Sequence, residues 1–408
     1  MNFTNIIINA ILIFLLFIPN ICIAQTIGPS YCGPYNSSQP VLINSKNDTT
    51  ISLLKISNPS GHCLKITNCN NIIIEKCMLG PSIGNGIDLY NCTNVEIRDC
   101  RIDSVASGVF ALASKIINIH NIEVKNVQGP FPRGQMVQFD KVDSIGNRVN
   151  YNVAENILGE SYPEDAISMY KSNGTSIDPI QIKGNWIRGG GPSSSGGGIM
   201  AGDNGGSYME IEDNILVNPG QYGIAISSGT EIEIRNNKIY SKQQSFSNVG
   251  IYVWNQYASP CNNNTVSGND VNWTNNLGVI NNNWDGGGCG TIIDWNNNNW
   301  GANIDSNILP QQILLNCLSV QIEKSNVFKE SLKLYPNPSN GNLTIEFKLM
   351  EKKNGMFILY DISGKKMMDQ VINRALSVIN LENLLPGIYF YEVMNANKTH
   401  KGKLIKQE

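Results

Sequence analysis

A six-residue pattern of apolar and polar positions recurs along most of the chain. Each copy has Ile or Val first, Asn or Cys fourth and a second aliphatic residue sixth, and the copies are spaced by 22 to 34 residues. The copies are IEKCML at 74–79, IRDCRI at 97–102, VAENIL at 153–158, IKGNWI at 182–187, IEDNIL at 211–216, IRNNKI at 234–239 and VSGNDV at 266–271, with IHNIEV at 119–124 as a degenerate copy. Apolar and polar residues alternate around them, as in Ile232-Glu233-Ile234, which is typical of brief strands joined by tight turns. Repeats of this length predict a parallel β-helix, in which each coil buries its apolar face only by stacking on its neighbours, whereas a β-propeller would need longer and more regular repeats.

The polar position of the pattern carries a second prediction. Asn or Cys stands at the same place in successive copies, as at Cys77, Cys100, Asn185 and Asn214. An inward polar side chain there can hydrogen-bond to the backbone at a bend and to its own copy above and below, which satisfies groups that are costly to bury. We therefore expect a column of Asn and Cys side chains inside the stack.

The N-terminal residues have the pattern of a secretory signal. An apolar run from Ile6 to Ile18 is followed by Pro19 and Ala24, so we expect residues 1–24 to be a signal peptide that is cleaved before Gln25. The run of about 13 residues is short for a membrane span, and no other segment qualifies, so no transmembrane segment is expected in the mature protein.

Residues 25–317 are expected to form the β-helix with a cap at each end, because open solenoid ends need covering. Two apolar runs, Val41 to Ile43 and Ile51 to Ile56, would form the N-terminal cap and first coil. The Asn/Trp-rich stretch from Trp273 to Trp300 would form the C-terminal cap. Its Trp and Asn side chains could also bind sugar, but aromatic covering of a core edge is the favoured interpretation.

The pattern changes after a polar linker at residues 318–330. Runs separated by Asn-Pro, Ser-Gly and Pro-Gly turns predict strands of a small antiparallel sandwich. The landmark segments are Leu334-Tyr335-Pro336-Asn337-Pro338, Leu359-Tyr360-Asp361-Ile362-Ser363-Gly364, Leu384-Leu385-Pro386-Gly387-Ile388-Tyr389 and Lys403-Leu404-Ile405-Lys406. In this order they resemble a type A C-terminal sorting domain of the type IX secretion system over residues 331–408. The resemblance implies the type IX secretion machinery as a partner, and a secreted or cell-surface location in a Gram-negative bacterium.

The predicted fold class is therefore all-β, a right-handed parallel β-helix solenoid followed by a small antiparallel β-sandwich domain. Over roughly residues 40 to 300 the coils resemble the pectate-lyase-like superfamily, which implies polysaccharide as a partner. The polygalacturonase motifs Asn-Thr-Asp, Gly-His-Gly and Arg-Ile-Lys and the epimerase motif Asp-Pro-His-Asp are missing. These absences weaken hydrolase and epimerase interpretations and leave a lyase that uses Lys, Arg and carboxylates.

Charge argues against one class of partner, and the cysteine content limits how the thiols can pair. Residues 331–408 hold 11 Lys+Arg against 7 Asp+Glu, a net +4, so residues 1–330 hold the remaining 19 against 26, a net −7. A mildly acidic solenoid argues against nucleic acid as a partner. Nine cysteines remain after signal cleavage, so at least one is free or pairs between chains. The pairs Cys69/Cys92 and Cys77/Cys100 are each 23 residues apart and would form either a buried thiol ladder or disulfides.

One strand series predicts the working surface of the solenoid. If the first Ile or Val of each strand points inward, the period of two sends every second residue outward. That outward row is Asp88, Tyr90, Phe110, Gln138, Asp140, Ser168, Tyr170, Met200, Tyr252 and Trp254. Aromatic rings interrupted by acids and amides suit the faces and hydroxyls of sugar rings, so the predicted substrate-binding residues are Tyr90, Gln138, Tyr170, Tyr252 and Trp254.

Charged and glycine-rich loops flank the middle strands of this series. The candidate catalytic residues there are Lys171, Asp165, Asp203, Asp140 and Arg188. Lys171 and Arg188, with Arg133 or Lys141, could hold a polyanionic uronate, while the acids, with Glu164, could bind calcium or act as acid and base. Calcium is the one cofactor considered, and no metal ligand is assigned. His120 is expected to be structural.

Two functions follow from these residues and stay open at this point. The first is a secreted enzyme that cleaves an extracellular acidic polysaccharide, most simply by the lyase route. The second is a non-catalytic glycan-binding or adhesive surface protein, because β-helices also serve as passive binding rods. They differ in geometry: an enzyme needs acid and base side chains converging in a cleft, and a binder needs only an aromatic strip.

Overall fold

The computed structural model describes residues 26–317, 332–347, 355–372, 374, 376–395 and 398–407. The signal peptide and the linker predicted from the sequence lie outside these residues. The chain divides after Cys317 into two compact units, a large N-terminal one and a small C-terminal one. Both are built of strands, and the only helical elements described are the single 3-10 turns η1 (Trp295–Asn297) and η2 (Ser306–Ile308).

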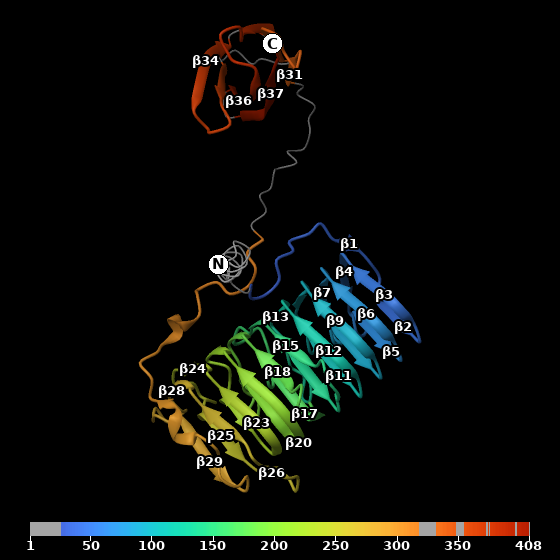
Figure 1. Ribbon diagram of the computed structural model, residues 1–408, viewed down its shortest axis with the longest axis vertical. Helices are drawn as coiled ribbons and strands as arrows, with labels where there is room; N and C mark the ends of the chain where they lie inside the picture. Colours follow the sequence, from blue (N-terminus) through green and yellow to red (C-terminus); the bar gives the residue numbers. More distant parts are fainter. Residues whose placement is uncertain are drawn as a thin grey trace, which may run out of the picture. The chain divides into compact units, whose positions relative to one another are not determined.

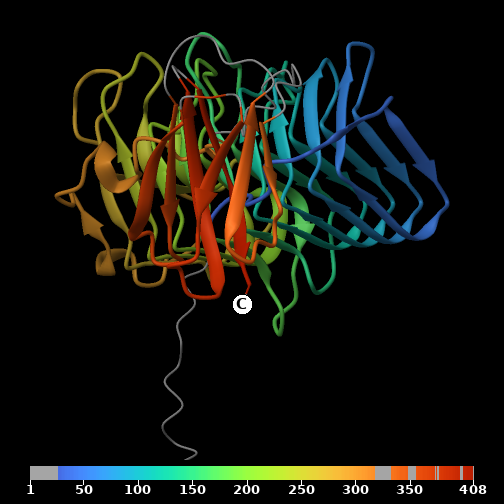
Figure 2. The ribbon, with the colours of Figure 1, turned by 90° about the horizontal axis from the view of Figure 1, so that it is seen from above.

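The N-terminal unit is a parallel β-helix, in which every strand of one coil pairs in parallel with the equivalent strand of the next (Figures 1 and 2). One stack of strands, here named the groove sheet, contains β2 (Val41–Asn44), β5 (Leu64–Thr67), β8 (Ile87–Tyr90), β11 (Val109–Leu112), β14 (Val137–Asp140), β17 (Ile167–Asn173), the first half of β20 (Ile199–Glu212), β22 (Tyr222–Ile226), β25 (Val249–Trp254) and β29 (Asn283–Gly287). The all-β class and the parallel β-helix predicted from the sequence are confirmed.

Two further stacks complete each coil. The second, named the charged sheet, contains β3 (Asn47–Ser52), β6 (Asn70–Glu75), β9 (Thr93–Arg98), β12 (Lys115–His120), β15 (Arg148–Asn150), β18 (Ile180–Lys183), the second half of β20, β23 (Gly229–Arg235), β26 (Cys261–Asn262) and β27 (Thr265–Ser267). The third, named the strapped sheet, contains β1 (Asn36–Ser37), β4 (Leu54–Asn58), β7 (Met78–Ser82), β10 (Arg101–Asp103), β13 (Glu123–Lys125), β16 (Val153–Glu155), β19 (Trp186–Arg188), β21 (Ile215–Val217), β24 (Lys238–Ser241), β28 (Asp270–Trp273) and β30 (Asn299–Trp300). The long strand β20 bends from the groove sheet into the charged sheet.

Inward columns of aliphatic side chains form the core. Ile87, Val109, Val137, Ile167 and Ile199 are partners in consecutive strands of the groove sheet, and all five are fully buried. The predicted alignment of this strand series is therefore confirmed, and with it the outward direction of the intervening residues.

An asparagine column runs through the interior beside the core. The side-chain amide of each Asn donates to the amide oxygen of the next, over 2.7 to 3.0 Å. Its members are Asn152, Asn185, Asn214, Asn237, Asn269 and Asn298. The same oxygens also accept from backbone N–H groups of the preceding coil, as Asn214 does from Asn185 N at 2.9 Å. Each side chain thus closes one bend and stacks on its copy, as predicted.

One member of the predicted series is out of register. Trp186 pairs with Val153 and Ile187 with Ala154, so Asn185 stands above Asn152 and not above Asn156. The true repeat in this coil begins at Val149, which pairs with Ile182, and the VAENIL alignment at 153–158 is wrong. Asn156 instead accepts from Val127 N in the neighbouring coil, and Leu158 is exposed.

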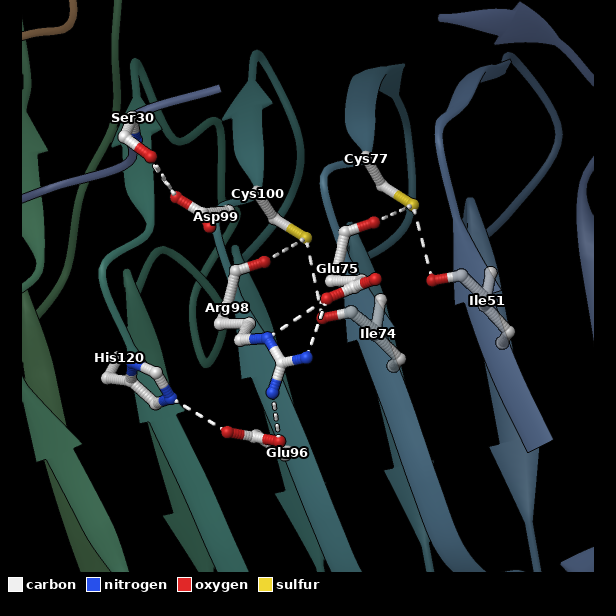
Figure 3. Close-up of polar contacts among 10 residues, drawn as sticks. All are labelled: Ser30, Ile51, Ile74, Glu75, Cys77, Glu96, Arg98, Asp99, Cys100 and His120. Carbon is white, nitrogen blue, oxygen red and sulfur yellow. Dashed lines mark hydrogen bonds and ion pairs between the residues drawn. The ribbon is translucent and has the colours of Figure 1, made fainter. Parts of the chain in front are cut away.

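In the first coils the column position is held by thiols. Cys77 and Cys100 lie on successive coils, and each Sγ donates to a carbonyl of the coil below, that of Ile51 or Ile74 (Figure 3). Cys69 and Cys92 form the equivalent pair at another bend. These four thiols and Cys63 are free and buried, which selects the thiol-ladder interpretation over disulfides for both pairs. The disulfides of the unit are Cys261–Cys289 and Cys32–Cys317.

Both ends of the β-helix chain are tied against the strapped sheet. Ile27 from the first segment and Leu309 and Ile313 from the last pack in one apolar cluster with Val153 and Val217. The Cys32–Cys317 disulfide joins residues 285 positions apart in the sequence. The stack also extends further than predicted, because Asn298 continues the column and β30 continues the strapped sheet.

The small C-terminal unit consists of two antiparallel sheets. One contains β31 (Leu332–Tyr335), β32 (Asn342–Phe347) and β35 (Leu376–Asn380), and the other contains β34 (Lys366–Ile372), β33 (Gly355–Tyr360), β36 (Gly387–Asn395) and β37 (Lys398–Lys406). Leu343, Ile345, Phe357, Leu359 and Leu404 are among the fully buried residues of their shared core. The predicted antiparallel arrangement is confirmed.

Replacement of Asn214 by Ala is expected to destabilise the β-helix by about 2–4 kcal/mol, because it leaves the N–H of Asn185 without an acceptor and removes two donated bonds. The midpoint of urea unfolding measures the loss. Asn44→Ala, at an exposed position whose side-chain oxygen accepts from Asn68 and Ser45, is the control and should change stability by less than about 1 kcal/mol. Equal effects of the two replacements would show that the buried column adds nothing particular.

Candidate functional site

A groove of about 910 Å³ lies on the outer face of the groove sheet, over β14, β17, β20, β22, β25 and β29. Its floor is the outward row predicted from the sequence: Gln138, Asp140, Ser168, Tyr170, Met200, Tyr252 and Trp254. Its walls come from the loops at 131–135, 164–165 and 194–195 and from Tyr257 and Trp284. The middle and C-terminal coils are therefore the place where the side chains of the row converge.

Four carboxyl groups line this groove: Asp140, Glu164, Asp165 and Asp203. Asp140 pairs with Tyr170 on the next strand, and Tyr170 pairs with Asp203 on the one after. Two strand spacings place the Cα atoms of Asp140 and Asp203 about 9.6 Å apart, with the Tyr170 ring between them. The two acids therefore project into the groove from the same face of the sheet, with one strand between them.

Burial raises the pKa of both members of this pair, but their neighbours act in opposite directions. Lys141, Arg133 and Lys171 oppose the rise at Asp140. At Asp203 the hydrogen bond from the Tyr257 hydroxyl, at 2.7 Å, opposes it, and the charge of Asp140 adds to it. Asp140 is thus the acid beside cations and Asp203 the acid beside an anion, which favours ionisation of Asp140 before Asp203.

Asp140 also has an unused oxygen. Its Oδ1 is buried and accepts no hydrogen bond from the residues that the structure describes, and Lys141 Nζ lies at 4.0 Å. A buried carboxylate oxygen without a donor is costly unless a ligand or water supplies one. The burial of this oxygen without a donor disfavours the ionised form, in line with the raised pKa of Asp140.

Asp165 is buried beneath the groove wall against Tyr222. Its Oδ1 accepts from the Tyr222 hydroxyl and, at 3.1 Å, from Gly197 N. Gly197 lies between Asp165 and Tyr222 on the sheet. It has to be glycine, because a Cβ there would stand 2.7 Å from the Tyr222 ring. Burial raises the pKa of Asp165 to about 8, although the Tyr222 hydrogen bond opposes the rise. The Asp165 carboxyl is therefore neutral over most of the physiological range.

The raised pKa of Asp165 predicts a pH dependence of stability. Between about pH 4 and pH 8 the folded chain holds a proton at this carboxyl that the unfolded chain releases, so the free energy of unfolding falls as pH rises through this window. The slope from this one group is at most about 1.4 kcal/mol per pH unit, and it vanishes above the folded pKa. Asp165→Asn should lose this contribution, as seen in urea midpoints measured from pH 4.5 to 9. Asp103→Asn, at an exposed carboxyl on β10, should retain it. A wild-type curve that runs parallel to that of Asp165→Asn would contradict the assignment.

Aromatic side chains gather at the C-terminal end of the groove. The Tyr252 and Trp284 rings are 6.2 Å apart between centroids and the Trp254 and Trp284 rings are 5.5 Å apart. Trp254 is 40% exposed, whereas Tyr252 is nearly buried and its hydroxyl accepts from Gln256. The free ring surface of this platform is therefore supplied by Trp254 and Trp284.

Several predicted site residues lie elsewhere. Lys171 is exposed, with Nζ 5.3 Å from the Tyr170 ring centroid, and does not line the groove. Arg188 is on β19 of the strapped sheet, where it pairs with Glu155 at 3.1 Å and donates to the carbonyls of Pro310 and Gln311. These contacts hold the last segment of the β-helix unit against the strapped sheet, so the assignment of Arg188 to the catalytic group is corrected. Tyr90 is exposed on β8, outside the groove lining.

Other groove residues were missed or passed over by the sequence interpretation. Trp284 was assigned to a cap, and Tyr222 and Tyr257 carried no signal beyond their aromatic type. Glu164 was named only in passing, and its carboxylate accepts from Ser193 and Ser195 in the glycine-rich loop. Tyr222 was findable in principle, because it follows Asp165 and Gly197 at the same position of successive coils. Within the described residues, no three His, Cys, Asp or Glu side chains are grouped so as to hold a metal ion.

Comparisons with known proteins identify two regions. Residues 40–193 match the family described as a right handed beta helix region, and residues 333–407 match the secretion system C-terminal sorting domain. No curated protein matches the chain.

Two phage proteins are among the similar solved structures. The tailspike protein gp49 from Acinetobacter baumannii bacteriophage Fri1, a capsular polysaccharide depolymerase, is 9% identical with a TM-score of 0.28, over 87% of this chain and 60% of the tailspike. Tailspike protein 2 from Escherichia coli O157:H7 bacteriophage CAB120 is 10% identical with a TM-score of 0.29, over 90% of this chain and 64% of the tailspike. This chain spans less than two-thirds of either tailspike, and at these scores the likeness carries no argument about function.

In the part of the chain that the structure describes, no helix is long and apolar enough to cross a bilayer. The sorting domain indicates that the chain is exported by the secretion system that recognises this domain. The chain therefore contains a right-handed β-helix region and a secretion system C-terminal sorting domain, and it is a protein secreted by, or carried to the surface of, a Gram-negative bacterium.

Proposed function

We propose that the protein cleaves an extracellular polysaccharide by hydrolysis, with Asp203 as the general acid and Asp140 as the general base. The observation that carries the proposal is the pair of carboxyl groups on either side of Tyr170 that line one groove of about 910 Å³. Hydrolysis with inversion uses two carboxyl groups about 6.5–9.5 Å apart, one protonating the leaving oxygen and the other activating water. With Cα atoms about 9.6 Å apart, a modest inclination of the two side chains toward each other would bring their carboxyl groups into that range.

The roles within the pair follow from the neighbours of each acid. Asp203 is expected to remain protonated longer, because burial and the charge of Asp140 both disfavour its ionised form. Asp140 is expected to ionise first, because Lys141 and Arg133 favour its charge. Separated pKa values in one pair are the condition for acid and base to act together at one pH.

Hydrolysis has more support than elimination. Cleavage of a uronate by elimination needs a base next to the sugar and cations that neutralise its carboxylate. Lys171 and Arg188, the two cations expected to do this, do not line the groove. The two cations that do line it, Arg133 and Lys141, act on Asp140 and not on Asp203.

The test is incubation of the purified protein with a panel of neutral and acidic polysaccharides, followed by assay of reducing ends and of ultraviolet absorbance from unsaturated uronates. New reducing ends without that absorbance are expected. Reducing ends accompanied by the absorbance would replace hydrolysis by the lyase route and remove Asp203 as the acid.

Non-catalytic glycan binding is the second candidate, and the aromatic platform of Trp254 and Trp284 favours it. Such stacking binds a sugar ring without any chemistry. Affinity electrophoresis through gels that contain each polysaccharide separates the two functions. Retardation of the protein with no product formed over the whole pH range would establish the binder and overturn the enzyme.

A further inference from the structure

Arg133 is an exception among the arginines of the β-helix. The described residues 26–317 contain six arginines, and five of them form an ion pair with a carboxylate. On the charged sheet, for example, Arg98 lies between Glu75 and Glu96 (Figure 3). Arg133 has no carboxylate oxygen within 4.0 Å among the described residues, and it is the one arginine that lines the groove.

The surroundings of Arg133 hold it in place without neutralising it. Its guanidinium lies 3.8 Å from the centroid of the Phe110 ring and donates to Gln138 Oε1 at 3.0 Å. Both partners are uncharged, and burial lowers the pKa of Arg133. The charges of Asp88 and Asp140 oppose this shift, but neither carboxylate forms an ion pair with Arg133, and Asp88 faces His62 at 3.4 Å. A partly buried guanidinium with free donors in a groove is a ready site for an anion.

The groove is therefore polarised along the solenoid axis. Arg133 and Lys141 stand at its N-terminal end, near β11 and β14, and the Trp254 and Trp284 rings stand at its C-terminal end, on β25 and β29. Four strand spacings, about 19 Å, separate β14 from β25. Asp140 lies on β14 at the N-terminal end, and Asp203 lies on β20 between the two ends. The C-terminal platform includes no basic residue among the described residues that line the groove.

We infer that the groove selects a mixed polysaccharide, in which Arg133 binds an anionic substituent and a neutral sugar ring stacks on Trp254 and Trp284. This inference rests on the proposed function only where it concerns cleavage. The two ends of the groove bind the polysaccharide whether or not the bond between them is cut. The anionic group is a uronate carboxylate or a sulfate ester, since either accepts two parallel hydrogen bonds from a guanidinium. Planar recognition of this kind is specific to arginine, so lysine is not an equivalent replacement at position 133.

The experiment is a charge cycle measured as binding. The panel contains acidic polysaccharides with neutral co-residues, each in its native form, after reduction of carboxylates to alcohols, and after removal of sulfate esters. For the polymer that the full-length wild-type protein retains in affinity electrophoresis, loss of the relevant anionic group is expected to weaken binding about 10- to 100-fold. The arm that weakens binding identifies carboxylate or sulfate as the group.

The same chemical change is expected to have little effect on Arg133→Gln, because that variant has already lost the partner of the anion. Arg133→Lys should recover only part of the discrimination. Trp254→Ala should weaken native and neutralised polymers by the same factor, because stacking is independent of charge. Arg235→Gln, which removes a paired and partly exposed arginine from the charged sheet, is the matched control and should bind as the wild type does.

Three results would overturn the inference: retention of no anionic polymer of the panel by the wild type, equal losses on neutralisation in the wild type and in Arg133→Gln, or tighter binding of the neutralised polymer. The proposed function fails separately. Charge-dependent binding through Arg133 without product formation would leave the anion site intact and remove the enzyme, whereas cleavage that is indifferent to Arg133 would do the reverse. Secretion level and circular dichroism of each variant establish that the fold is retained.

Discussion

Asp203→Asn is expected to abolish most polysaccharide cleavage, with a fall in kcat of about 10²- to 10⁴-fold, the usual contribution of a general acid. Asparagine keeps the shape of the side chain and can still accept from the Tyr257 hydroxyl, so binding should change little. Asp140→Asn should have a loss of similar size, because it removes the base on the other side of Tyr170. Initial rates of reducing-end formation, compared with retention in affinity gels, separate the two effects.

The pH profile provides the internal check on this pair. The acidic limb of the wild-type profile should report ionisation of Asp140, and the alkaline limb should report deprotonation of Asp203, whose pKa is raised by burial. The alkaline limb should disappear from the residual activity of Asp203→Asn. Asp103→Asn, at an exposed carboxyl outside the groove, is the control. Full activity in Asp203→Asn would exclude this residue as the acid.

Ile234→Asp is expected to prevent accumulation of folded protein, with a loss of more than about 4 kcal/mol in the free energy of unfolding. Ile234 is fully buried and stacks between Ile211 and Val266 of the adjacent coils. A carboxylate at this point would be buried among aliphatic side chains without a partner, and each neighbouring coil would lose part of its packing surface. The readouts are the secreted yield and the urea midpoint of any protein recovered.

Lys238→Asp is the matched control, because it introduces the same aspartate four residues later on the exposed side of β24. It should secrete and unfold as the wild type does, within about 0.5 kcal/mol. Normal secretion of a folded Ile234→Asp variant would contradict the inward register of this strand.

The coarse architecture was predictable because it depends on local periodicity. A period of two in a strand decides which residues point inward, and the spacing of the Ile-x-x-Asn pattern places successive strands over one another. Hence Ile87, Ile167 and Ile251 were correctly assigned to the core, and Asp140, Tyr170 and Trp254 to the outer face. The motifs of the sorting domain were equally readable, since turn residues stand at fixed offsets between its strands.

The register failed where the local sequence offered two solutions. Asn152 and Asn156 each precede an apolar residue by two positions, and both windows resemble the repeat. The choice depends on which of them stands beneath Asn185, and that is decided by the stacking of a neighbouring coil more than 30 residues away. The pairing of Cys32 with Cys317 was also unpredictable, because only the path of the first and last segments of the β-helix unit brings these two residues together.

By itself, the sequence determined the solenoid fold, the export of the chain and which strand residues point outward. Each of these follows from repeats and motifs that the chain carries locally. Tertiary structure alone decided which charged groups meet. It moved Arg188 to the strapped sheet, left Lys171 outside the groove, and placed Arg133 and Tyr257 in its walls. The physical reason is that the period of a strand fixes the direction of a side chain but not its partners. Arg188 on β19 and Lys171, at a left-handed bend of β17, are placed by the path of the coil, and Arg133 and Tyr257 are placed by the contacts of their loops.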